Sequence, residues 1–479
     1  MKEKKISVNL IFSALKTLMG VLFPLITFPY ATRILGPEYI GKIDYAFANV
    51  SYFALIGAFG ISGYAVREGA KYRDSRKKIS EFVGEMLAIN LVTVVVAYSL
   101  CFASFFVPKW KPYRGIMLIF SSTIILTAVG LEWLYNIYED YKYIAIRAVC
   151  FQILSLIILV TFVKSQKDYL IYVLTIITAS VGSNILNVIR ARKYIDYKII
   201  FNSNFFRNIK PMFFLFIMNV ASSIYLVMDK SMLGYITESD IEVGLYATAM
   251  KISTVITSII ASVRMVTTPR SAYYKKSNPK KSEEINYMSL ELMLLFSIPC
   301  AIGMCLIGDS VILAFAGKEY TEAGGILKLL MLDVVFACVN GSLVNQFFVI
   351  NQKDKKAASA VILGAITNLI SNSIMIPYIG KTGAAISTCL SELVIMCFAC
   401  IAGREVIKIE KMLPQIVQSI IASIPIVAIY LFVNNLGISD VLSVACTVCV
   451  GALFYFVVLF MLRNKYVVDA FNAIMKKRR

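Results

Sequence analysis

Apolar stretches of about 20 residues recur along the chain, separated by short polar links. A helix rises 1.5 Å per residue, so about 20 apolar residues cross the roughly 30 Å hydrocarbon core of a bilayer. The pattern predicts an all-α polytopic membrane protein with about 14 transmembrane helices. The predicted spans are 8–35, 40–66, 80–107, 114–137, 144–163, 168–190, 211–236, 244–268, 286–308, 324–350, 357–377, 382–403, 414–434 and 440–462.

Charge along the links indicates the orientation of these spans. The chain has a net charge of +19, and basic residues gather at 67–78, 190–210, 270–281 and in the closing KKRR. The link at 236–243, ITESDIEV, has three acids and no base. Because basic residues collect on the cytoplasmic side of membrane proteins, we predict a multi-pass protein of the cytoplasmic (inner) membrane with both termini inside. The same bias accounts for the positive charge without any nucleic-acid partner.

Composition narrows the classes of function. The chain is 58% hydrophobic and only 16% charged, and it has no histidine, whereas soluble proteins carry roughly 25% charged residues. Its ten cysteines lie almost wholly within apolar runs, where small residues favour close helix packing. No link is long enough for a nucleotide-binding or catalytic domain. The sequence therefore predicts a transporter and not an enzyme, with no cofactor and no metal.

Two segments of the chain read alike. ATRILGPEYIGKIDYAFA begins at Ala31 and DKSMLGYITESDIEVGLYATAMK begins at Asp229. Each contains Leu-Gly, a short acidic link and then a hydrophobic residue followed by glycine. Gly41 corresponds to Gly244 at an offset of 203 residues, close to six spans.

This repeat predicts two pseudo-symmetric lobes in the same orientation. The lobes are residues 1–205 and 206–405, each with six helices, and residues 406–479 add two transmembrane helices and a basic cytoplasmic tail. Parallel repeats of this kind are a transporter architecture, with the substrate site at the interface of the repeats.

The segment PYATRILGPEYIGKIDYA, its second copy and the fourteen-span layout together resemble the polysaccharide transporter family. Its members are lipid-linked oligosaccharide flippases of O-antigen, capsule and exopolysaccharide pathways. They belong to the multidrug/oligosaccharidyl-lipid/polysaccharide exporter superfamily, which also holds the MATE exporters and the peptidoglycan-precursor flippases. The motif lies mainly within residues 28–75.

The resemblance implies a MATE-like fold and a flippase. The expected substrate is an undecaprenyl-diphosphate-linked oligosaccharide, moved across the membrane for surface polysaccharide biosynthesis by alternating access. Membrane lipids and polysaccharide assembly proteins are the further partners that it implies. Coupling to Na⁺ or H⁺ is also a property of relatives.

Basic residues inside the spans are candidate substrate ligands. A charge at the bilayer centre costs at least about 2.5–3.5 kcal/mol, so such residues mark functional sites. We expect Lys16 and Lys251 to line a cationic central cavity, and Arg33 and Arg264 to lie at its mouth. There they would replace the lost hydration of a diphosphate with charge-assisted hydrogen bonds. The alternative is that these side chains form ion pairs or reach to the interface.

Acidic residues near the spans are candidates for ion coupling. Asp44 is expected to pair with Arg33 and Lys42 in the first hairpin, and Asp229 with Lys230 and Lys251 in the second. The ion-coupling candidates are Asp44, Asp229, Lys230 and Glu392. A neutral, hydrogen-bonded Glu392 is the alternative.

Helix-breaking residues in the first hairpin are candidates for a hinge. Pro29, Gly36 and Gly41 bracket the link between the first two spans, where bending would allow one lobe to rock against the other. A tight turn that needs only Gly36 and Pro37 explains them equally well.

Two other functions fit parts of this pattern. A MATE-like, ion-coupled small-molecule exporter shares the layout, but cationic drugs need an acidic cavity and these spans carry more bases than acids. A membrane polysaccharide polymerase or ligase is the enzyme alternative, and it would need larger outer loops than this chain has.

Overall fold

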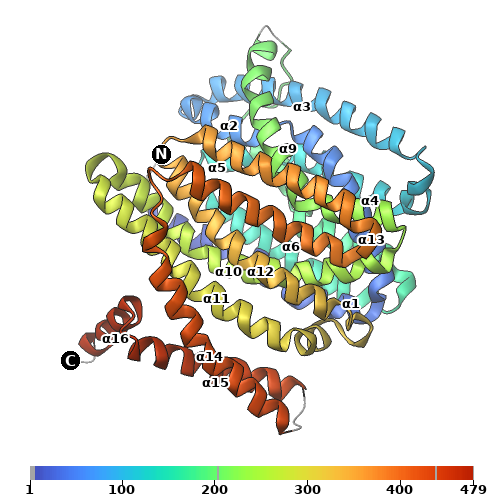
Figure 1. The fold of residues 1–479 in the computed structure, drawn as a ribbon. Helices are drawn as coiled ribbons and strands as arrows, with labels where there is room; N and C mark the ends of the chain where they lie inside the picture. The colour runs from blue at the N-terminus through green and yellow to red at the C-terminus, as the bar shows by residue number, and fades with distance from the viewer. Residues whose placement is uncertain (1–5, 202–203, 437–439, 478–479) are drawn as a thin grey trace. The chain divides into compact units, whose positions relative to one another are not determined.

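The structure is a computed structural model that describes residues 6–201, 204–436 and 440–477. Within those ranges the chain folds into helices joined by short links (Figure 1). The α-helices are α1 (Ile6–Ala58), α2 (Ile61–Gly69), α3 (Arg76–Ser104), α4 (Arg114–Val129), α5 (Glu132–Ile137), α6 (Tyr141–Phe162), α7 (Tyr169–Ile177), α8 (Asn184–Ala191), α9 (Asn204–Thr237), α10 (Asp240–Ser277), α11 (Pro279–Ala316), α12 (Ala323–Ser342), α13 (Asp354–Ala402), α14 (Leu413–Asn435), α15 (Asp440–Met461) and α16 (Lys465–Lys477).

The predicted all-helical membrane protein is confirmed. Among the described residues, 11 stretches are long and apolar enough to cross a membrane. They overlap every predicted span except 211–236, which lies within α9. Two of the stretches, 15–72 and 354–402, each overlap two predicted spans. The count of fourteen spans stays a prediction.

The chain reverses inside α1 at Gly36. This residue has φ 71° and ψ 171°, a conformation that only glycine adopts without strain. Before it, Lys16 contacts Glu132 at the start of α5. After it, Gly57 lies against Ile124 near the end of α4. Residues 20 positions before Gly36 and 21 positions after it thus lie near the same end of α4, as two antiparallel helices require.

A second reversal lies inside α13. Gly380 has φ 50° and ψ −130°, again outside the range of other residues. Gly364 lies against the side chain of Ile395, and Gly383 against the backbone of Met375. Both pairs are centred on residues 379–380. The predicted spans 357–377 and 382–403 are therefore the two arms of one helical hairpin.

The chain divides into two compact units, residues 1–244 and 245–479. In the first, α1 packs against α3, α4, α6 and α9. In the second, α11 packs against α12, α14 and α15, and α12 packs against α13. The predicted lobe boundary at residue 205 stays a prediction. Helix α9 belongs to the first unit.

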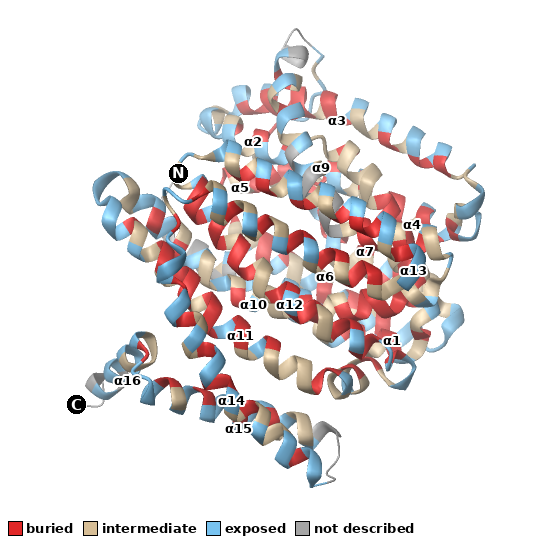
Figure 2. Cartoon of the chain, viewed as in Figure 1, coloured by how far each residue is buried: buried red, intermediate tan, exposed pale blue. Residues whose placement is uncertain are grey.

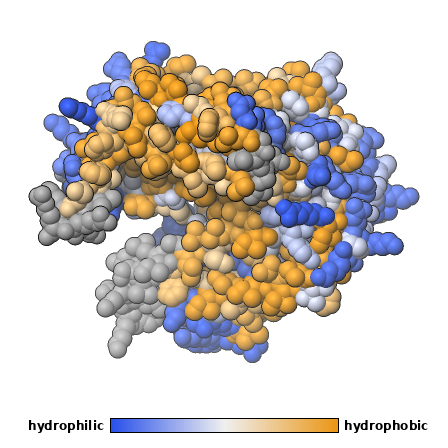
Figure 3. Space-filling view, turned by 90° about the horizontal axis from the view of Figure 1, so that it is seen from below, coloured by the Kyte–Doolittle hydropathy of each residue, from blue (hydrophilic) through white to orange (hydrophobic). Residues whose placement is uncertain are grey.

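Burial follows the helices as stripes. In Figure 2 buried and exposed residues alternate along the helices. The exposed stripes are largely apolar, as Ile26 at 61% and Phe432 at 67% exposure illustrate. Apolar side chains cover wide areas of the face drawn in Figure 3, and hydrophilic ones gather towards its margins. Such a surface is suited to contact with the hydrocarbon core of a bilayer, because exposing apolar side chains to lipid tails is more favourable than exposing them to water.

Candidate functional site

Lys16 belongs to a charged cluster in the first unit. Its ammonium group donates to one carboxylate oxygen of Glu132, and the other oxygen accepts from Arg147 at 3.1 Å. The side chain of Arg147 is only 2% exposed, whereas those of Lys16 and Glu132 are 42% and 37% exposed. One carboxylate therefore joins a buried cation to an accessible one, and the three groups carry a net charge of +1.

The local fold places Glu132 and Arg147 together. The chain breaks between α4 and α5 at Leu131, whose φ is 44°, so that Glu132 starts a new helix. From α8, Asn184 accepts a hydrogen bond from Arg147 at 2.8 Å. Asn187 donates to the Gly130 carbonyl at 2.6 Å, which ties α8 to the same break. Both terminal nitrogens of Arg147 thus have acceptors among the described residues, whereas its buried Nε has none.

Arg147 was missed by the sequence reasoning. It is the one charged residue in the apolar run IAIRAVC, at the start of a predicted span. An arginine inside such a run is itself the signal, because its burial requires a carboxylate or several acceptors nearby. Pairing it with Glu132 from the sequence would have required knowing that α5 and α6 are adjacent.

Residues that follow the reversal of α1 at Gly36 and residues near the end of α9 form a second charged cluster. Asp44 accepts from Lys230, and not from Lys42 as predicted. Lys42 instead pairs with Glu38 at 2.6 Å and lies 4.0 Å from Asp240. The expected pairing within each hairpin is thus wrong for Asp44, since its ion pair crosses from α1 to α9. A hydrogen bond of 2.8 Å from Ser231 to Asn49 joins the same two helices.

Asp229 precedes Lys230 on α9 but lies deeper. It is 2% exposed. Arg33, on the first arm of α1, is an exposed residue. The ion-coupling candidates Asp44 and Lys230 therefore form one pair, while Asp229 occupies a separate, more buried position.

Glycines allow the two repeated segments to cross closely. A Cβ added at Gly41 would lie 1.7 Å from the carbonyl oxygen of Asp240, and one at Gly244 would lie 2.0 Å from that of Pro37. Pro37 and Gly41 are each offset by 203 residues from Asp240 and Gly244. The contact is therefore reciprocal. The two-lobe repeat read from the sequence stays a prediction.

Two of the candidate residues in the second unit lie close together. Glu392 is 7% exposed and accepts from the amide of Asn340, which also donates to the Glu392 carbonyl at 2.7 Å. Arg264, from α10, lies against Gly341, the residue next to Asn340. Lys251, which comes earlier on the same helix, is half-buried. Lys16 and Arg33 belong to the first unit.

Arg264 passes directly over a glycine. A Cβ at Gly341 would lie 1.0 Å from a terminal guanidinium nitrogen of Arg264. We therefore expect Gly341→Ala to displace Arg264 and to reduce transport about as strongly as Arg264→Ala does. Gly325→Ala, in the same helix with no atom near the added Cβ, is the matched control. Full transport by Gly341→Ala would contradict the role of this contact.

Metal chemistry has no visible basis in the described ranges. Within residues 6–201, 204–436 and 440–477, no three Cys, Asp or Glu side chains gather as metal ligands would. The charged clusters described above each combine acids with bases.

A family model described as "Polysaccharide biosynthesis protein" matches residues 6–275 of the chain. The chain belongs to this family. It is 25% identical over 389 residues to a Shigella dysenteriae protein provisionally named as an O-antigen transporter, covering 79% of this chain and 94% of that protein. A similarly named protein of Escherichia coli K12 is 22% identical over 401 residues, covering 82% and 95%. The resemblance inferred from the sequence is confirmed.

Solved structures show the same fold. The lipid II flippase MurJ, in an inward closed conformation, superposes with a TM-score of 0.78 at 17% identity, covering 96% of this chain and 100% of that one. An inward-facing MATE family multidrug transporter gives a TM-score of 0.60 at 14% identity, covering 82% and 97%. The predicted MATE-like fold is thus confirmed at the level of architecture.

Proposed function

We propose that this membrane protein is a flippase that moves an undecaprenyl-diphosphate-linked oligosaccharide across the cytoplasmic membrane for surface polysaccharide biosynthesis. The substrate crosses by alternating access, through a cationic cavity to which Lys16, Arg33, Lys251 and Arg264 contribute. Both termini lie in the cytoplasm. Family membership, and the transporter and flippase names of the relatives, support transport over enzymatic activity.

The observation that carries this proposal is the accessible cation in a membrane-embedded cluster. Lys16 is 42% exposed although it lies within a predicted span, and Arg147 neutralises its carboxylate partner from the buried side. A diphosphate can therefore take the place of Glu132 at Lys16 without leaving that carboxylate unpaired. Charge-assisted hydrogen bonds of this kind are the strong ones for phosphate groups.

Ion coupling is part of the proposal. Glu392 and Asp229 are buried carboxylates, one in each unit, and each is a candidate to bind a proton or Na⁺ during the cycle. Moving one charge across 100 mV contributes about 2.3 kcal/mol, which biases the direction of transport. Asp44 and Lys230 couple to the same step through their ion pair. Pro29, Gly36 and Gly41 provide the bending of the first hairpin.

Reconstitution tests the function directly. The purified full chain is placed in liposomes that carry an undecaprenyl-diphosphate oligosaccharide in both leaflets, and a membrane-impermeant glycosidase is added outside. Wild-type protein is expected to expose nearly all of the oligosaccharide, whereas protein-free liposomes expose about half. Lys318→Ala, which removes an exposed lysine from the link after α11, should behave as wild type.

Three results would contradict the proposal in different ways. Protection of the inner-leaflet oligosaccharide in the presence of wild-type protein would exclude a flippase. Export of a cationic dye from the same liposomes without oligosaccharide movement would favour the MATE-like exporter. Formation of a new glycosidic bond would favour a polymerase or ligase.

A further inference from the structure

A sharp turn that is stabilised by hydrogen bonds separates α16 from the last predicted span. Arg463 has φ 54°, which turns the chain sharply after α15. The amide of Asn464 donates to Gln415 at 3.0 Å and to Gln418 at 2.7 Å, both on α14. Its side-chain oxygen accepts from the backbone nitrogen of Tyr466 at 3.2 Å. The starting point of α16 is thereby fixed against α14.

A buried acid holds the first turn of α16. Lys465 pairs at 2.7 Å with Glu291 of α11, and the Tyr466 hydroxyl donates to the same carboxylate. Burial and this hydrogen bond raise the pKa of Tyr466, so its hydroxyl stays protonated and remains a donor. Tyr466 and Val467 also pack on a small core formed by α11, α14 and α15. The helix is therefore anchored to the second unit at one end.

Beyond this anchor, α16 is amphipathic. Its apolar positions 467, 471, 474 and 475 follow the i, i+4, i+7, i+8 spacing of one helix face. Lys465, Asp469, Asn472 and Lys476 are spaced along the opposite face. Phe471 and Met475 remain 48% and 50% exposed, although the Phe471 ring contacts Phe460 of α15 at 5.1 Å between centroids.

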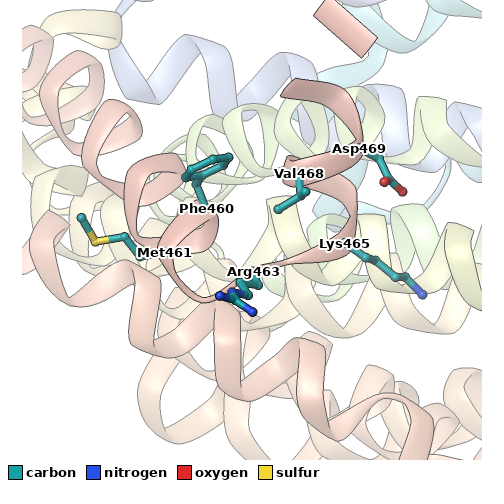
Figure 4. Close-up of a pocket in the computed structure, with 6 residues that line it drawn as sticks. All are labelled: Phe460, Met461, Arg463, Lys465, Val468 and Asp469. Carbon is teal, nitrogen blue, oxygen red and sulfur yellow. The ribbon is translucent and has the colours of Figure 1, made fainter. Parts of the chain in front are cut away.

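A pocket lies at the junction of α15 and α16 (Figure 4). Its lining residues are Phe460, Met461, Arg463, Lys465, Val468 and Asp469. Two cations and one acid, Asp469, thus stand beside three apolar side chains, directly after a predicted span. This combination suits a lipid whose headgroup is anionic and whose acyl chain lies along the span.

We propose that α16 lies in the membrane surface and that the α15–α16 junction binds an anionic phospholipid, through the headgroup phosphate at Arg463 and Lys465. The exposed apolar face of α16 enters the headgroup boundary, as amphipathic helices with a basic polar face do. The sequence after the span contains six basic residues and one acid, from Arg463 to Arg479, which complements an anionic leaflet.

A membrane fits this face better than a partner protein. The apolar residues follow the last span within 20 positions, so a bilayer is already adjacent to them. The anchor at Glu291 keeps α16 close to the helices that it follows. The inference is independent of the cargo and holds whether or not the proposed function is right.

Photo-cross-linking tests the proposal on the full chain. A benzophenone amino acid replaces Met475, and the protein is placed in nanodiscs with equal amounts of phosphatidylglycerol and phosphatidylcholine. Mass spectrometry should find more phosphatidylglycerol than phosphatidylcholine adducts. The ratio of the two adducts should rise by about fivefold for each basic residue near the surface. The same probe at Phe432, an exposed residue within a span, should show a ratio near one.

Charge removal supplies the second arm. Arg463→Gln, which leaves the Lys465–Glu291 anchor in place, should lower the adduct ratio at position 475 about fivefold, while Lys318→Gln leaves it unchanged. Unaltered lipid adducts at position 432 show that the variant is folded. A ratio of one in the wild-type protein would overturn the proposal, and so would cross-links to protein in place of lipid.

Discussion

Lys16→Ala is expected to weaken binding of undecaprenyl diphosphate to the purified protein by about tenfold. A hydrogen bond to a charged group is worth about 1.5–3 kcal/mol, and partial exposure places Lys16 at the lower end of that range. The residue is 42% exposed and has one carboxylate partner, so a phosphate can reach it. Equilibrium binding in detergent measures the effect as a change in Kd.

Glu132→Gln is expected to act in the opposite direction. Removing the carboxylate charge leaves Arg147 bound to Asn184 and frees Lys16 for the ligand. Binding of undecaprenyl diphosphate should tighten several-fold, while transport in liposomes slows because release has lost its competing anion. Tighter binding together with slower transport is expected only if the ligand replaces Glu132 as the partner of Lys16. A purely structural role for the ion pair does not predict this combination.

Arg147→Lys provides the control for this pair of variants. Lysine keeps the positive charge but has no second nitrogen to donate a hydrogen bond to Asn184. We therefore expect a modest loss of protein stability and an unchanged Kd for undecaprenyl diphosphate. If Lys16→Ala and Glu132→Gln both lower thermal stability and leave Kd unchanged, the cluster is structural only. In that case the cationic cavity must rely on Arg33, Lys251 and Arg264.

Gly41→Ala is expected to destabilise the protein and to abolish transport. The added methyl group would lie 1.7 Å from the Asp240 carbonyl oxygen, which belongs to the backbone and cannot rotate away. The crossing segments would have to separate, at a cost of about 1–3 kcal/mol or more. A lower melting temperature and loss of oligosaccharide movement in liposomes would together report this.

Gly20→Ala is the matched control for this prediction. Gly20 is on the same helix with no atom near its added Cβ, and alanine favours a helix over glycine. It should leave transport intact and raise stability slightly. Gly244→Ala should copy Gly41→Ala, because the contact is reciprocal. Wild-type transport by Gly41→Ala or by Gly244→Ala would show that the two segments can separate without loss of function.

Much of the fold could be predicted from the sequence because hydropathy reports spans directly. Each predicted span overlaps one or two described helices, and the chain reverses at Gly36 and Gly380, in the links between predicted spans. Gly41 and Gly244, which the sequence comparison paired, also lie in close contact, while the two-lobe repeat stays a prediction. What hydropathy cannot report is which helices are neighbours, because lipid-facing and buried stripes are equally apolar.

The candidate site was less predictable for the same reason. Lys16 stood out by its depth in a span, but its partner Glu132 lies 116 positions away. Asp44 was assigned a partner close in sequence, whereas Lys230 reaches it from α9. The ion-pair partner of a charged residue within these helices depends on which helices are neighbours in space. The sequence alone does not show this, and it suggests partners that are close along the chain. The roles of these residues in binding and coupling remain proposals.

The crossing of the two hairpins also constrains how relatives of this protein can vary in length. Pro37 and Gly41, like Asp240 and Gly244, are four positions apart, which is about one helical turn. Deleting or inserting a single residue inside either interval would rotate the glycine by about 100° and present a side chain to the opposing carbonyl. Outer links of membrane proteins usually tolerate such changes. Here, gaps in an alignment of the family should avoid both intervals.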